Sequence, residues 1–301
     1  MTLLNRWLSG SSAYGSYQAF VRTIVEPLYD RLGVEVVAGE HKLERYARSI
    51  AINLACQAGL SKCLNQSAEK LKQVINNGLK IAPDLQSSLY CNGLRQSNSS
   101  TFFYLQNKML QSKDQAERTL IINALGCAQD EVLLTQYLNL ALIPGDALRL
   151  QEKFRVLAAP LNNGELGLRV IIDFIRYNFH AINEILPTQV NTMLSNVASR
   201  VASQSIYNEF TSLLTLLQEY GGITEGNTNT YRSSARVNIA WQTANLGAIE
   251  NFFKNEESTT PAPTPSIPVT TPSTTSTTLG AGSVAISTFA LVGCALIKHF
   301  L

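Results

Sequence analysis

The sequence predicts an all-α protein, built as an irregular α-solenoid and followed by a disordered stalk and a short hydrophobic tail. Apolar residues recur with helical spacing between residues 16 and 254. No strand-like alternation of useful length interrupts them. A single helical bundle is the alternative architecture, but about a dozen helices are more than one bundle holds. We therefore expect a helical domain at 1–254, a stalk at 255–279 and a tail at 280–301.

The first two expected helices are marked by apolar residues at i, i+3, i+4 and i+7. The first covers 17–32, ends at Gly33 and is expected to kink at Pro27. The second ends before Gly59, and its apolar stripe is expected to face the core. The residues of that stripe are Leu43, Tyr46, Ile50 and Leu54.

The next helices are bounded by residues that start or stop a helix. A helix from Ser61 ends at Asn77-Gly78, and Pro83 suits the first turn of another that carries Leu85 and Leu89. Six further stripes have the same period. They lie at 116–124, 132–140, 168–175, 194–201, 210–217 and 231–254.

The short connections between these helices favour stacked antiparallel pairs. Such pairs form the superhelices of HEAT and armadillo proteins, which are curved and present a concave binding face. The sequence therefore predicts a binding surface on the inner side of the solenoid.

Composition excludes several classes of function. The net charge of +2 leaves no electrostatic footprint for nucleic acid. The histidines, His41, His180 and His299, are too far apart for H-E-x-x-H, so a self-contained zinc hydrolase is excluded and no metal site is expected. No G-x-S-x-G, P-loop or dinucleotide fingerprint is present either.

The carboxyl end is typical of a tethered surface protein. Residues 258–278 are almost entirely Ser, Thr and Pro, which indicates an O-glycosylated stalk or an ordinary disordered linker. The apolar run 284–297 is too short for a stable membrane span and fits a GPI-attachment signal, with a tail anchor or a buried helix as alternatives. Gly280 is the expected attachment residue, and Ser276 is the alternative.

Residues 1–8 do not form a secretory signal peptide, because they contain Arg6 and lack a sustained apolar core. A GPI anchor requires secretion. We therefore expect the chain to be the carboxyl-terminal piece of a longer secreted protein, or a truncated isoform or incomplete gene product.

Four cysteines lie in the helical region and allow three disulfide connectivities. Cys56 lies in the last turn before Gly59 and Cys63 in the first turn after it, so a tight helical hairpin brings them together. Cys91 and Cys127 remain as the second pair. Free buried thiols are the alternative, and the spacing does not suit a zinc site.

Two N-glycosylation sequons occur, Asn65-Gln66-Ser67 and Asn98-Ser99-Ser100. Asn98 lies in a polar stretch expected to be a loop, so it is the stronger candidate. Asn65 lies on a predicted helix beside Cys63.

Several motifs, in their order, resemble the carboxyl-terminal helical domain of aminopeptidase N-like zinc aminopeptidases. The resemblance covers roughly residues 1–255, and the stalk and tail are similar to those of membrane-bound insect midgut members. The motifs are Arg48–Cys56 with Gly59 and Cys63, Ile81–Leu85, Leu89–Leu94, Glu117-Arg118, Asn123–Cys127, Arg149–Glu152, Asn162 with Gly164, and Asn238 with Trp241.

The resemblance implies a helical superhelix that walls and gates a substrate chamber without catalysing the reaction. Zinc and its ligands are expected in a separate upstream domain, and no cofactor is expected in this chain. The implied partners are peptide substrates, the membrane through a GPI anchor, and a second copy in a homodimer. Arg149 is one candidate for contact with a peptide, although the family has Asp where this chain has Glu152.

Two alternatives to a peptidase domain stay open. The chain could be a stand-alone GPI-anchored surface module that binds a peptide or a protein, or an independent enzyme of another class. As a peptidase domain or as a surface module, the chain is expected on the extracellular face of the plasma membrane, as a disulfide-bonded glycoprotein, if a signal peptide lies upstream.

Overall fold

The computed structural model describes residues 2–259, and side chains from residue 4 to residue 254. The chain divides into two compact units, Met1–Lys254 and Asn255–Leu301. The first contains thirteen α-helices, the last of which runs on to Thr259, with two short 3-10 helices and no strand among the described residues. The all-α prediction is therefore confirmed for this part of the chain.

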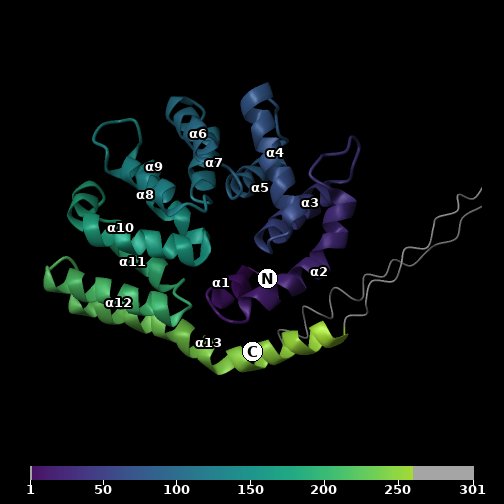
Figure 1. Ribbon diagram of the computed structural model, residues 1–301. Helices are drawn as coiled ribbons and strands as arrows, with labels where there is room; N and C mark the ends of the chain where they lie inside the picture. The colour runs from purple at the N-terminus through teal and green to yellow at the C-terminus, as the bar shows by residue number, and fades with distance from the viewer. Residues whose placement is uncertain (1, 260–301) are drawn as a thin grey trace, which may run out of the picture. The chain divides into compact units, whose positions relative to one another are not determined.

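The helices follow one another with short connections (Figure 1). Their bounds are α1 Thr2–Leu8, α2 Tyr14–Leu32, α3 Lys42–Gln57, α4 Ser61–Asn77, α5 Pro83–Leu94, α6 Ser99–Gln111, α7 Gln115–Leu125, α8 Glu131–Asn139, η1 Leu140–Leu142, α9 Leu150–Ala158, η2 Ala159–Asn162, α10 Gly164–Ile185, α11 Val190–Ala198, α12 Gln204–Glu219 and α13 Glu225–Thr259.

Local signals set many of these bounds. Side chains of Asn98, Asp114 and Asp130 accept hydrogen bonds from backbone N–H groups in the first turns of α6, α7 and α8. Gly78 ends α4 in the left-handed conformation that favours glycine. Pro83 occupies the first position of α5, as the sequence predicts.

Consecutive helices pack as pairs, α2 with α3, α4 with α5, and α6 with α7. Helices α3, α5 and α7 also pack side by side. The last helix returns to the first ones, because the aromatic rings of Phe252 and Phe253 on α13 contact the ring of Phe20 on α2 (Figure 1). The described helices therefore share one continuous core.

The expectation that the apolar stripe of α3 is buried was wrong for most of its length. Leu43, Tyr46 and Ile50 are 70%, 70% and 58% exposed. The opposite face is buried instead and includes Arg48, whose Nε donates to the Leu32 carbonyl at 2.9 Å and whose Nη1 pairs with Glu40 at 2.6 Å. The buried charge of Arg48 is therefore paired with that of Glu40.

Candidate functional site

A cavity with a volume of about 470 Å³ lies among segments that are far apart in the chain. Helix α1 forms one wall. The segment from η2 into α10 and the segment that joins α11 to α12 form others. Polar residues on the cavity wall are Asn5, Arg6, Ser9, Gln57, Asn162, Glu165 and Arg200, and apolar ones are Leu161, Leu168, Ala202 and Ile206.

Two arginines give the cavity its cationic character. Burial, and then the nearby charge of Arg6, lower the pKa of the Arg200 guanidinium. Arg200 Nη1 donates to the Asn196 carbonyl at 3.0 Å, whereas the Nε of Arg6 is buried without a hydrogen-bond partner. Neither arginine forms an ion pair with a carboxylate of the described residues.

One carboxylate also lies on the cavity wall, and it is engaged elsewhere. Glu165, in the first turn of α10, accepts a hydrogen bond from the hydroxyl of Ser203. Gly10, which has a φ of +81°, brings the α1–α2 turn so close that a Cβ at this position would overlap the Glu165 carboxylate. Glu165 is thus held by Ser203 and forms no ion pair with either arginine, although its carboxylate lies on the wall of the same cavity.

Arg6 and Arg200 were not among the residues that the sequence singled out. Arg6 lies in the first eight residues, where the sequence indicates only that no signal peptide is present, and Arg200 lies within the helix predicted at 194–201, two residues beyond the observed end of α11. They are separated by 194 positions, as their numbers show. No local pattern could have indicated that they share a cavity.

Arg149, the arginine that the sequence proposed for peptide contact, lies at the start of α9 and not on the cavity wall. Its backbone N–H donates to Glu152 Oε2 at 2.9 Å, and its Nη2 lies 3.5 Å from Oε1. Its contact with a peptide stays an untested prediction.

Glu152 is the centre of a buried polar cluster. Arg118 donates to it from Nε at 2.8 Å and from Nη2 at 3.1 Å. Burial by itself would raise the pKa of Glu152, but the hydrogen bonds from Arg118 and Arg149 and the Arg118 charge lower it to about 2. Glu152 is therefore a structural partner of Arg118.

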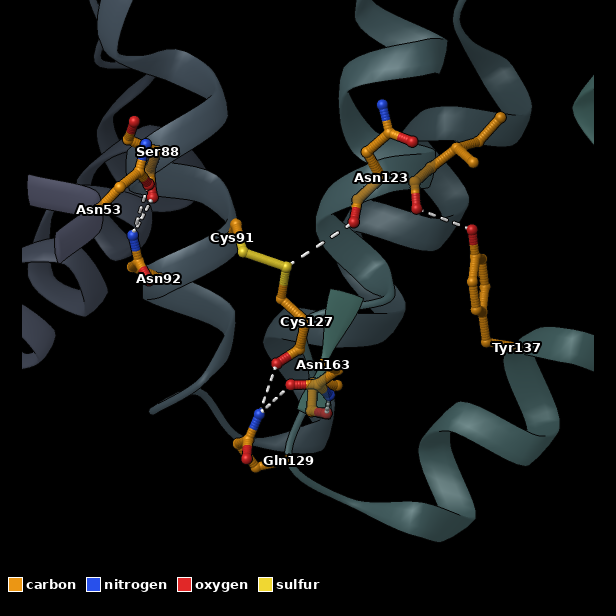
Figure 2. Close-up of a disulfide and its surroundings, with 11 residues drawn as sticks. Asn53, Ser88, Cys91, Asn92, Asn123, Cys127, Gln129, Tyr137 and Asn163 are labelled. Carbon is orange, nitrogen blue, oxygen red and sulfur yellow. Dashed lines mark hydrogen bonds between the residues drawn. A yellow bond between two sulfur atoms is a disulfide. The ribbon is translucent and has the colours of Figure 1, made fainter. Parts of the chain in front are cut away.

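Both expected disulfides are present. Cys56 is bonded to Cys63 across the α3–α4 turn, and Cys91 on α5 is bonded to Cys127 in the turn after α7. Figure 2 shows the second bridge.

Hydrogen bonds fix the turn that carries Cys127. Gln129 Nε2 donates to the Cys127 carbonyl at 3.0 Å and to Asn163 Oδ1 at 2.6 Å (Figure 2). The Asn163 amide in turn donates to the Ala128 carbonyl at 2.6 Å. The second bridge and these bonds therefore join α5, α7 and the start of α10.

The two sequon asparagines are exposed, but Ser67, the hydroxyl residue of the Asn65 sequon, is fully buried. Asn65 is exposed on α4. Asn98 is also exposed, but it caps α6 rather than lying within a loop, since its Oδ1 accepts from the Thr101 N–H at 3.1 Å. The amide nitrogen that would carry a glycan makes no contact in this cap. The attachment candidates Gly280 and Ser276 lie outside the described residues.

The described side chains do not fit a zinc ion. They contain no group of three or more His, Cys, Asp or Glu that could hold a metal. His41 instead caps α3, where its Nδ1 accepts from the Leu43 N–H at 3.2 Å. None of the helices between residues 2 and 259 is both long and apolar enough to span a bilayer.

Comparison with known proteins places these features in a family. A family model described as the ERAP1-like C-terminal domain matches residues 1–221. The chain is 25% identical to an aminopeptidase N of Plutella xylostella over 89% of its own length and 29% of that protein. It is 22% identical to a membrane alanyl aminopeptidase of Manduca sexta over 90% of its length and 28% of the relative.

A mammalian relative shows the same partial coverage. An aminopeptidase N of Bos taurus is 28% identical over 58% of this chain and 18% of its own length. The chain thus spans less than a third of the relatives that it matches. On the strength of the family match over residues 1–221, this chain belongs to the ERAP1-like C-terminal domain family.

Proposed function

We propose that this chain is the non-catalytic carboxyl-terminal domain of a zinc aminopeptidase, where it walls and gates the chamber that admits peptides. Zinc and the catalytic residues belong to an upstream domain. In this proposal the cavity receives the carboxyl end of a peptide whose amino end reaches the zinc. The relatives are aminopeptidases by name, which supports a peptide as the ligand.

The pair of arginines without carboxylate partners carries this proposal. Guanidinium groups bind carboxylates through charge-assisted hydrogen bonds, which are about twice as strong as neutral ones. Arg6 and Arg200 line different walls of the same cavity, and neither forms an ion pair with a described carboxylate. A volume of about 470 Å³ accommodates a terminal residue with its carboxylate.

Binding of matched peptides tests the proposal. A short fluorescent peptide with a free carboxyl end is expected to bind the full chain more tightly than the same peptide with a carboxamide end. Arg6→Ala or Arg200→Ala should weaken the free-acid complex about tenfold, because each removes a charged hydrogen-bond donor, and should leave the amide complex nearly unchanged. Fluorescence anisotropy gives both dissociation constants.

Arg155→Ala is the matched control, since Arg155 is exposed on α9 and does not line the cavity. Equal affinity of the wild-type chain for acid and amide peptides would contradict the carboxylate role. For the non-catalytic role, chelator-sensitive release of aminoacyl-naphthylamide product by the purified chain would be the contradicting result.

We further propose that the protein acts at the cell surface, on the extracellular face of the plasma membrane. The small residues and short apolar tail support a GPI anchor at Gly280, or at Ser276. The exposed sequon at Asn98 supports an N-glycan there, whereas a glycan at Asn65 is proposed on the exposure of Asn65 alone, because Ser67 of that sequon is buried. Release from membranes by phosphatidylinositol-specific phospholipase and mass spectrometry of the glycopeptides test these two points. A homodimer is also proposed, and sedimentation analysis tests it.

A stand-alone surface module remains the second candidate. The exposed stripe Leu43, Tyr46 and Ile50 on α3 favours it, since contiguous apolar surface marks binding sites. The 5′ end of the transcript distinguishes the two. An upstream region encoding H-E-x-x-H supports the peptidase domain, and a signal peptide directly before Met1 supports the module.

A further inference from the structure

We infer that one turn of α13, formed by Asn238, Trp241 and Gln242, is a clasp that positions the two arginines of the cavity. The inference rests on the proposed carboxylate site and concerns how that site is kept in shape. None of the three clasp residues lines the cavity. They are therefore positioning residues, acting through the elements that carry Arg6 and Arg200.

Helix α1 depends on contacts from outside itself. It has only seven residues, far fewer than an isolated helix needs for stability in water. The Trp7 ring lies 4.3 Å from the Trp241 ring, measured between centroids, and the Trp7 carbonyl accepts a hydrogen bond from Gln242 Nε2 at 3.0 Å. Both contacts come from α13 and lie next to Arg6 in the chain.

The same turn of α13 also holds the other wall of the cavity. Asn238 Nδ2 donates to the Ala198 carbonyl at 3.3 Å, at the end of α11 and two residues before Arg200. Residues three apart in a helix share a face, so Asn238 and Trp241 reach the two walls from one turn. Figure 1 shows α13 passing below α12 and α1. The clasp therefore sets the spacing between Arg6 and Arg200.

Such a restraint is needed because the two arginines have like charge. Burial, and after it the charge of Arg6, disfavour the protonated form of Arg200 and lower its pKa. Without an anion between them, repulsion favours a movement of α1 away from α11. Loss of the clasp should therefore free α1 and separate the arginines while the rest of the helices stay folded.

The test compares Trp241→Ala, the conservative Trp241→Phe and the control Val237→Ala in the full chain. Val237 precedes the clasp and is 65% exposed. Hydrogen exchange should show faster exchange of the α1 amides in Trp241→Ala only. The preference for the free-acid over the amide peptide should fall about tenfold in that variant and be largely restored by Trp241→Phe.

Trp7 and Trp241 are the only two tryptophans of the chain, so intrinsic fluorescence reports this contact directly. Binding of a tryptophan-free acid peptide should change the emission of the wild-type chain, and the amide peptide should not. If circular dichroism shows that Trp241→Ala does not fold, Asn238→Ala replaces it in the exchange and peptide-binding measurements, because this substitution removes only the hydrogen bond to Ala198.

The outcomes separate the two proposals. A wild-type chain that binds acid and amide peptides equally refutes the carboxylate site. Unchanged α1 exchange and unchanged peptide preference in folded Trp241→Ala and Asn238→Ala variants refute the clasp.

Discussion

Replacing Glu152 by Gln removes the negative charge from the buried pair with Arg118 and keeps the shape of the side chain. Glu152 is 1% exposed in its side chain, and it accepts two hydrogen bonds from Arg118 in a bidentate arrangement. Arg118 also donates to the carbonyls of Met109 and Ala147, at 2.9 and 2.7 Å. In Glu152→Gln the bonds from Arg118 to the two carbonyls persist, but the guanidinium charge loses its counterion, and the new amide NH2 group cannot accept the hydrogen bond that one carboxylate oxygen accepted.

A buried ion pair that loses one partner costs about 3–5 kcal/mol, mostly because the remaining charge is left uncompensated. Arg118 is nearly as buried as Glu152, with a side-chain exposure of 11%. Its carbonyl partners offset part of the cost, so we expect about 3 kcal/mol. For a domain of about 250 residues this lowers Tm by about 6–12 °C.

Thermal and urea unfolding of the full chain measure the effect. Glu184→Gln, on the exposed surface of α10, is the matched control and should change the free energy of unfolding by less than about 0.5 kcal/mol. A cycle with Arg118→Met should show a coupling of about 1–3 kcal/mol between the two residues. A loss below about 1 kcal/mol in Glu152→Gln would refute the structural role of the pair.

The pH dependence provides a second readout of the same pair. The pKa of Glu152 falls from its usual 4.5 to about 2 in the folded chain. Because the folded value is the lower one, the contribution of the pair is complete above about pH 4.5 and declines as pH falls toward 2. As pH falls through this range, the free energy of unfolding of the wild type should decrease by about 2 kcal/mol more than that of Glu152→Gln, after allowance for solvent screening.

Two further predictions concern covalent and steric restraints. Changing Cys91 and Cys127 together to Ala removes a disulfide that joins residues 36 positions apart. Urea unfolding should show that the free energy of unfolding falls by up to about 4 kcal/mol, and no measurable decrease would contradict this. Gly10→Ala should cost about 1–3 kcal/mol in thermal unfolding, because the new Cβ is strained and overlaps Glu165. Gly39→Ala, with similar φ and open space, isolates the strain, and an equal loss in both would refute the overlap.

Much of the helical architecture was predictable, because its signals are local. The predicted end at Asn77-Gly78 is the end of α4, and the predicted start at Pro83 is the start of α5. The helix predicted at 231–254 lies within α13. Three helices were missed, α1, α6 and α9. Helix α6 begins in a stretch that was assigned to a loop, since its first residues are polar and its signal is the cap by Asn98.

The face of α3 could not be predicted from its period. Periodicity shows that a helix is amphipathic, but it does not show whether a charged residue on the other face finds partners. Arg48 has such partners in Leu32 and Glu40, so its face is buried and the Leu43 face is exposed. These contacts depend on the path of the chain before α3.

The sequence by itself determined the fold class and the family, because helix period, caps and motif order are read along the chain. It also predicted the Cys56–Cys63 pair, whose cysteines flank one turn, and left Cys91 and Cys127 as the second pair, which the structure confirms. The exposed face of α3, the cavity and the clasp were decided only by tertiary structure. Arg6 is separated from Arg200 and Trp241 by most of the domain. Contacts from α13 reach Trp7 beside Arg6 and Ala198 near Arg200, and no local pattern encodes these contacts.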